Sequence, residues 1–325
     1  MKTAKEIEIY QLAPDPEALM QSYVIKTPNG KLVVIDGGMS VVAEPPKSYL
    51  PAALRAIACV GEGEYFEVEA WFLSHPHSDH FSELARALNE YMGGSNYKIK
   101  QIYFDFPPFE TDDFPYADAE RNATMKLKAG LDHYASVCGV EVEKGRAYYD
   151  CLNGAVIHSR SVKDGLTIEI DGVRFEILLT WDKARGSDAN NHSLIILMQG
   201  LGQKVLFLND CQVAEGKDLL KFYPDKIKSD IVQMSHHGQD GVGKDVYDAI
   251  GATRYLWPTP IWVWNNTVNF RIGETRTWIN GCDFTIPDKN HLVACLYKAY
   301  PADRFSVESW KQVKNGMKMV VSGQE

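Results

Sequence analysis

The sequence predicts an α/β fold in which two packed β-sheets are flanked by helices. Short segments of alternating or continuous apolar residues, typical of strands, occur in both halves of the chain. Segments with helical spacing of apolar residues follow the strands of each half. The chain has 325 residues, of which 45% are hydrophobic, so it can bury a sizeable core. Strands and helices distributed in this way favour two sheets with helices on their outer faces.

The expected elements follow one another in a simple order. In the first half, strands are expected at 6–12, 22–27 and 31–38, with "PNG" at 28–30 as a hairpin turn, then a helix at 48–59, a strand at 66–74, an amphipathic helix at 80–92 and a strand at 97–106. In the second half, strands are expected at 155–160, 166–170, 173–179, 191–200, 204–210, 230–235, 253–258 and 318–322, with helices near 215–222 and 243–250.

The whole chain, residues 1–325, is expected to form a single domain. The stretch around 105–150 combines an acidic, aromatic loop with one long helical segment. We interpret it as a helical and aromatic insertion rather than a second domain. The chain shows no internal repeat and no low-complexity linker.

The charge of the chain limits its partners. The formal net charge is −9, from 34 basic and 43 acidic residues, which argues against extended duplex nucleic acid and against an anionic membrane surface. A small molecule or a short anionic substrate remains compatible with local positive charge. The sequence shows no signal peptide and no apolar run long enough for a membrane helix, and its six scattered cysteines form no disulfide pattern. We therefore expect a cytoplasmic protein, and its oligomeric state is not indicated.

The segment "WFLSHPHSDHFSEL" at 71–84 places four ligand-type residues directly after an apolar strand. Side chains alternate along an extended segment, so His75 and His77 point the same way, whereas Asp79 and His80 lie at the start of the next helix. Imidazole nitrogens and carboxylate oxygens are zinc ligands. One loop could therefore serve two metal ions, although a polar loop with chance histidines is the alternative.

Two later strands also end in ligand-type residues. Asp210 ends the apolar segment "VLFLND", where a lone carboxylate is costly to bury unless it is paired or bound to a metal. His236 and His237 end the segment "DIVQMSHH". A core aspartate or a hydrogen-bonded core histidine is the ordinary interpretation of either site alone. Three strand ends of this kind favour a shared metal centre instead.

The HxHxDH motif, the strand-end aspartate and the later strand-end histidine resemble, in this order, the metallo-β-lactamase superfamily. The resemblance runs from "VVIDGG" at 33–38 to "HHG" at 236–238. It implies a four-layer αβ/βα sandwich with two mixed sheets flanked by helices. Asp36 matches the family's structural aspartate near the metal loop, with a simple turn residue as the alternative. The segments "NNHSLIIL", "GQKVLFLND" and "VQMSHHG" are most similar to the hydrolase domain of DNA-uptake competence proteins and its stand-alone relatives.

The resemblance also implies a set of metal ligands, which are His75, His77, Asp79, His80, His192, Asp210 and His236. His75 and His77 would hold one divalent ion, Asp79, His80 and His236 the second, and Asp210 would bridge them. The family often places a further histidine in an "HTxG" turn, which this sequence lacks. His192 is the candidate for that position, with a supporting or surface histidine as the alternative. Both ions are expected to be zinc.

The implied activity is hydrolysis by a metal-bound hydroxide, with a phosphodiester or another phosphoester as the favoured substrate. Asp79 and His237 are the candidate catalytic residues, and His237 either assists a leaving group or supports a ligand. Lactone, β-lactam and thioester hydrolysis are alternatives. A di-iron oxidoreductase is a second alternative, disfavoured because His77 occupies a position where those proteins tend to carry a carboxylate.

Two aromatic segments are candidates for substrate selection. Residues 104–116 and 257–271 could overhang the metal cleft, although ordinary packing of aromatic residues explains them equally well. Lys244 and Arg271 could meet a substrate anion, with solvated surface residues as the alternative.

Overall fold

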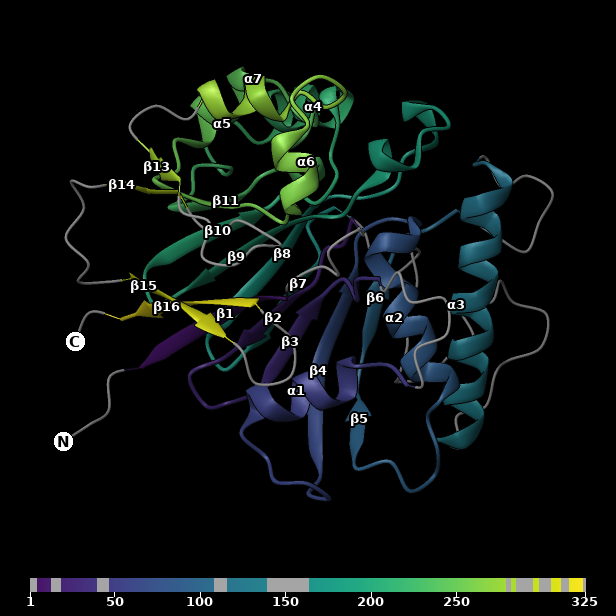
Figure 1. Ribbon diagram of the computed structural model, residues 1–325. Helices are drawn as coiled ribbons and strands as arrows, with labels where there is room; N and C mark the ends of the chain where they lie inside the picture. Colours follow the sequence, from purple (N-terminus) through teal and green to yellow (C-terminus); the bar gives the residue numbers. More distant parts are fainter. Residues whose placement is uncertain are drawn as a thin grey trace.

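The structure is a computed structural model that describes residues 5–12, 19–39, 47–107, 116–138, 164–278, 282–284, 295–297, 305–310 and 316–323. The described strands form two large sheets and one two-stranded ribbon. Figure 1 shows the two large sheets packed against each other, with helices on their outer sides.

The first sheet has the strand order β15-β16-β1-β2-β3-β4-β5, and β6 also pairs with β4. Its strands are β1 (Glu6–Leu12), β2 (Tyr23–Lys26), β3 (Leu32–Ile35), β4 (Phe66–Leu73), β5 (Tyr97–Ile99), β6 (Ile102–Phe104), β15 (Phe305–Trp310) and β16 (Gly316–Ser322). Strands β1 to β3 pair antiparallel, whereas β3 is parallel to β4 and β4 is parallel to β5 and β6. The sheet is therefore mixed, and β3 and β4 end at the same edge.

The second sheet has the strand order β12-β11-β10-β9-β8-β7. Its strands are β7 (Thr167–Ile170), β8 (Val173–Leu179), β9 (Ile195–Gly200), β10 (Gln203–Phe207), β11 (Ile231–Gln233) and β12 (Arg254–Leu256), and the separate ribbon consists of β13 (Cys282–Phe284) and β14 (Cys295–Tyr297). Strands β7 to β10 pair antiparallel, and β10, β11 and β12 are parallel. This sheet is also mixed.

The described helices lie in two outer layers. They are α1 (Leu50–Ala58), α2 (Ser78–Asn89), α3 (Asp118–Val137), α4 (Val213–Phe222), α5 (Lys244–Ile250), α6 (Ile261–Asn265) and α7 (Ile272–Trp278). One apolar cluster joins α1, α2 and α3 to the first sheet, a second lies between the sheets, and a third joins the second sheet to α4, α5, α6 and α7. The predicted four-layer αβ/βα sandwich is therefore confirmed.

The loop after β3 packs directly on the start of α2, beside the HxHxDH motif. A Cβ atom on Gly37 would lie 2.8 Å from Cβ of Leu84, so only glycine allows this approach. The backbone N–H of Gly38 donates to the carbonyl of His80 at 3.2 Å, and that of Glu83 donates to the carbonyl of Gly38 at 3.1 Å. These contacts fix the position of the loop after β3 relative to the HxHxDH motif.

Most predicted elements agree with the structure, with a few differences. The strand predicted at 97–106 is divided into β5 and β6, and helices α6 and α7 were not predicted. The insertion contributes α3, which packs on α2, whereas the strand predicted at 155–160 lies outside the described residues. The single-domain organisation stays a prediction. Of the described helices, none has the length and apolar character that crossing a membrane requires.

Candidate metal centre

Three loops bring the candidate ligands together where strands of both sheets end. Residues 75–80 follow β4, Asp210 follows β10, and residues 236–237 follow β11. Because β10 and β11 are parallel neighbours, the residues after their carboxyl ends lie side by side. The backbone N–H of Leu194 donates to the carbonyl of Ser74 at 2.9 Å, which joins the second sheet to the metal loop of the first.

Six side chains form two groups whose donor atoms could each hold one metal ion. The first group is His75, His77 and Asp210, and the second is Asp79, His80 and His237. Within each group the donor atoms lie within 4.8 Å of one another. Oδ2 of Asp210 also lies 3.3 Å from Nε2 of His80 and 3.5 Å from Nε2 of His237. Asp210 therefore occupies the position that a bridging carboxylate requires, and bridging itself stays a prediction.

The chemistry of these donor atoms fits divalent ions. Nε2 of His75, Nε2 of His80 and Oδ1 of Asp210 are buried and have no hydrogen-bond partner among the described residues. An unpaired buried polar group costs about 1–3 kcal/mol, so atoms of this kind normally have a partner. Imidazole nitrogens and carboxylate oxygens that converge in this way are the usual ligands of zinc. A pair of coordinated ions would satisfy all three atoms.

Asp36 orients the ligands of both groups. Its Oδ2 accepts hydrogen bonds from Nδ1 of His80 at 2.7 Å, from Oγ of Ser74 at 2.9 Å and from Nε2 of Gln21 at 3.0 Å. Nδ1 of His75 lies 3.0 Å from the same Oγ of Ser74. Because both rings use Nδ1 for these contacts, Nε2 of each is left for a metal. Asp36 is thus more than a turn residue, as the family resemblance implies.

The structure places His237 in the second group, whereas the sequence assigned His236, whose Nε2 lies 3.9 Å from Oδ2 of Asp210. Nδ1 of His237 lies 2.9 Å from the carbonyl oxygen of Pro258, so the ring donates there and Nε2 faces the site. His236 is half-buried, and its Nδ1 contacts Asp240 and lies 3.1 Å from Nε2 of Gln212. Both residues have left-handed backbone conformations, with φ of 48° and 54°. This strained pair of residues directs the second imidazole inward.

His192, which the sequence assigned to the first metal site, lies outside both groups. It is fully buried, and its Nε2 lies 2.9 Å from the carbonyl oxygen of Gly186. The backbone N–H of Asp182 donates to Nδ1 at 3.4 Å, and the ring packs near Tyr116 and Trp181. Because both ring nitrogens already have partners, His192 instead holds the loop between β8 and β9.

Neighbouring charges set the protonation of the buried ligands. Burial raises the pKa of Asp210, but His80 and His237 outweigh this effect and hold that pKa well below its usual value. Burial lowers the pKa of His80, but Asp210, Asp36 and Asp79 together raise it well above the usual value. A metal that binds His80 must therefore displace a proton, so metal binding is coupled to pH.

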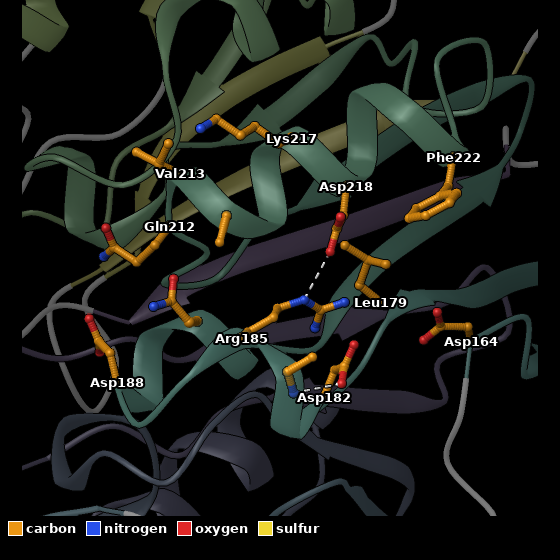
Figure 2. Close-up of a pocket in the computed structure, with 13 residues that line it drawn as sticks. Asp164, Leu179, Asp182, Arg185, Asp188, Gln212, Val213, Lys217, Asp218 and Phe222 are labelled. Carbon is orange, nitrogen blue, oxygen red and sulfur yellow. Dashed lines mark hydrogen bonds and ion pairs between the residues drawn. The ribbon is translucent and has the colours of Figure 1, made fainter.

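A groove of about 900 Å³ begins at Gln212, whose side chain contacts His236 at the rim of the metal centre. Its charged lining residues are Asp164, Asp182, Arg185, Asp188, Lys217 and Asp218. Figure 2 shows Arg185 pointing toward α4. Its Nε donates to Oδ2 of Asp218, a residue of α4, at 3.0 Å. The four aspartates outnumber the two cations, so this groove does not favour a polyanion.

The proposed specificity elements are only partly described. Residues 108–115 of the first aromatic segment lie outside the described residues. In the second segment, Trp257 and Trp264 are buried in the apolar cluster between the second sheet and its outer helices, whereas Trp262 is exposed. Lys244 pairs with Asp248 and Arg271 with Glu274, all of them on the surface. These contacts favour ordinary packing and surface ion pairs over contacts with substrate.

Two polar residues of the centre were not predicted from the sequence. Gln21 precedes β2 and joins Asp36 to Asn209, with its Nε2 2.6 Å from Oδ1 of Asn209. Glu120, in the first turn of α3, places its Oε1 3.8 Å from Nε2 of His77. Neither belongs to a local motif, so only the packing of distant elements reveals them.

Comparison with known proteins gives structural matches alone. No family model and no curated protein matches this chain. The metallo-beta-lactamase fold protein YhfI from Bacillus subtilis matches with 12% identity and a TM-score of 0.44, over 77% of this chain and 85% of YhfI. A long-form RNase Z from yeast matches with 10% identity and a TM-score of 0.40, over 78% of this chain and 37% of the other. CmlA, a diiron beta-hydroxylase from Streptomyces venezuelae, matches with 9% identity and a TM-score of 0.35, over 75% and 37%. At such low similarity, any activity must be argued from the residues of the site.

Proposed function

We propose that this protein is a dinuclear metal-dependent hydrolase of the metallo-β-lactamase superfamily, with zinc in both positions. The observation that carries the proposal is the pair of buried donor groups on either side of Asp210. The unpartnered Nε2 atoms of His75 and His80 support it, because a structural histidine would have both nitrogens engaged. The αβ/βα fold and the HxHxDH motif agree with the same superfamily.

Different residues of the chain would bind the ions, orient the ligands and position a water molecule at such a site. Bound zinc would supply Lewis acidity and lower the pKa of a coordinated water toward about 7. Asp36 and Pro258 orient His80 and His237, which keeps Nε2 of both rings directed inward. Asp79 lines a small cavity of about 240 Å³, so its carboxylate can orient a water molecule there. Asp79 is therefore proposed as both ligand and catalytic residue.

A short phosphodiester or another phosphoester is the proposed substrate. Two zinc ions carry four positive charges, and the carboxylates of Asp79 and Asp210 offset two of them, so the centre attracts an anionic group. The adjoining groove is acidic, which disfavours a long nucleic acid. A small molecule or short anion fits both the positive metal centre and the acidic groove. We further propose that the enzyme is cytoplasmic and related to the hydrolase domain of competence proteins.

Metal analysis and a substrate screen test this proposal together. The purified protein should contain about two zinc ions per chain, and Asp210→Ala should lose most of at least one. Asp248→Ala, which changes an exposed ion pair, is the matched control. The wild-type protein should cleave bis(p-nitrophenyl) phosphate in preference to nitrocefin, a lactone or a thioester. A protein that binds no divalent metal would exclude the proposal. Tightly bound iron would favour the oxidoreductase alternative, and nitrocefin turnover without phosphodiesterase activity would reverse the substrate ranking.

A further inference from the structure

The first metal group is less complete than the second. Its donors are His75, His77 and Asp210, and Asp210 also lies within 3.5 Å of both histidines of the second group. If Asp210 is shared, the first ion has only two ligands of its own. The second group has three ligands besides Asp210, so the first ion has one unshared ligand fewer than its neighbour. His192 does not supply the third, because both of its ring nitrogens are already engaged.

Glu120 is the carboxylate that approaches this group from outside the predicted motifs. Helix α3 packs on α2, and the first turn of α3 places Oε1 of Glu120 3.8 Å from Nε2 of His77. The two side chains are each 24% exposed. They line one cavity of about 240 Å³ together with Ser78, Asp79 and Ala119. Glu120 thus faces the mouth of the candidate metal centre.

The contacts of Glu120 are better suited to coordinating a cation than to a simple hydrogen bond. At 3.8 Å, Oε1 and the ring nitrogen of His77 are too far apart for a hydrogen bond. Two ligands of one tetrahedral zinc ion, each about 2.0–2.2 Å from it, lie about 3.3–3.6 Å apart, and the 3.8 Å between Oε1 and Nε2 exceeds this spacing only slightly. Oε2 of Glu120 is buried and has no hydrogen-bond partner among the described residues. A buried carboxylate oxygen without a partner is costly, and a cation would remove that cost.

We propose that Glu120 is the third unshared ligand of the first metal ion, besides the shared Asp210, and that it is supplied by the helical insertion rather than by the HxHxDH motif. The inference rests on the proposed function. Glu120 is not close to all three donors of the group in this structure, so its side chain must rotate toward the ion. The adjoining cavity leaves room for that rotation. The insertion would then take a direct part in the metal centre.

Zinc titration of matched variants tests this assignment. Glu120→Ala should keep one tightly bound zinc and weaken the other by more than about 100-fold, beyond the effect of a residue that only supports a ligand. Glu120→His, which restores a ligand at the same position, should recover the second zinc. Asp118→Asn, an exposed change in the same helical turn, should bind zinc like the wild type. Stoichiometry by mass spectrometry and affinity by competition with a chromophoric chelator are the measurements.

Double variants show which ion Glu120 holds. In a His77→Ala background, Glu120→Ala should cause little further loss of zinc, because both changes affect the same ion. In a His237→Ala background, it should remove most of the remaining zinc. Two zinc ions bound by Glu120→Ala within about 100-fold of wild-type affinity would overturn the inference and leave the proposed function intact, because that range is typical of a supporting residue. A wild-type protein without bound metal would overturn both.

Discussion

Nδ1 of His80 lies 2.7 Å from Oδ2 of Asp36, and both side chains are fully buried. Asp36 is itself held by the backbone N–H of Ser74 at 2.8 Å and by the side chain of Gln21. It adopts a left-handed backbone conformation with φ of 60° at the end of β3. A carboxylate in this position fixes the ring so that Nε2 faces the candidate metal site. The geometry of the site therefore depends on a residue that touches no proposed ion.

Asp36→Asn tests this relationship. The amide has nearly the same shape but can offer an N–H where the carboxylate offers only acceptors, so the tautomer of His80 is no longer fixed. We expect zinc affinity at the second site to fall by about 10–100-fold while the stoichiometry at saturating zinc stays at two. Competition with a chromophoric chelator measures the affinity. Affinity equal to that of the wild type would show that the hydrogen bond has no part in metal binding.

The pair His236→Ala and His237→Ala separates the structural assignment from the assignment made from the sequence. His237→Ala removes an inward-facing Nε2 and should abolish tight binding of one zinc ion. His236→Ala removes contacts with Asp240 and Gln212 and should leave two zinc ions bound. Each variant is the control for the other, because the residues are adjacent and share a left-handed conformation. The reverse result would restore the ligand set implied by the family resemblance.

The sequence predicts the fold and the local motifs of the centre, because these depend on short-range patterns. Strand periodicity reveals β4 and β10. The residues that directly follow these strands must lie near the edge of the sheets where the strands end. The choice between His236 and His237 depends on two left-handed residues, which no periodicity reveals. The contribution of Glu120 depends on how α3 packs on α2, which is a long-range relationship within an insertion.

His192→Ala distinguishes a ligand from a residue that orders a loop. The imidazole joins the carbonyl of Gly186 to the backbone N–H of Asp182, beside the groove. Its loss should leave a cavity and unpaired backbone groups, and reduce the free energy of unfolding by about 2–4 kcal/mol. Both zinc ions should remain bound. Urea unfolding and metal analysis of the same sample check the two parts. Loss of one zinc ion from a stably folded variant would show that His192 is a ligand after all.

The buried carboxyl group of Glu215 gives the protein a pH-dependent stability. Burial raises the pKa of Glu215 to about 8, although the backbone N–H of Gln212 donates to its Oε2 at 3.1 Å and Arg185 also opposes the shift. In the unfolded chain the same group titrates near about 4.3. Between these values the native state keeps a proton that the unfolded state releases, so stability is highest below the lower value and falls as pH rises toward 8.

Glu215→Gln keeps the size of the side chain and an acceptor for Gln212, but it has no proton to lose. The variant should be about 1 kcal/mol more stable than the wild type at pH 5, and much more stable at pH 8. At about 1.4 kcal/mol for each unit of pKa difference, the gain at pH 8 can reach about 5 kcal/mol. Glu62→Gln, an exposed change, should follow the wild type at both pH values. Because metal binding is coupled to pH, all samples are compared with equal metal content. Parallel stability curves for Glu215→Gln and the wild type from pH 5 to 8 would show that Glu215 is already ionised in the native protein.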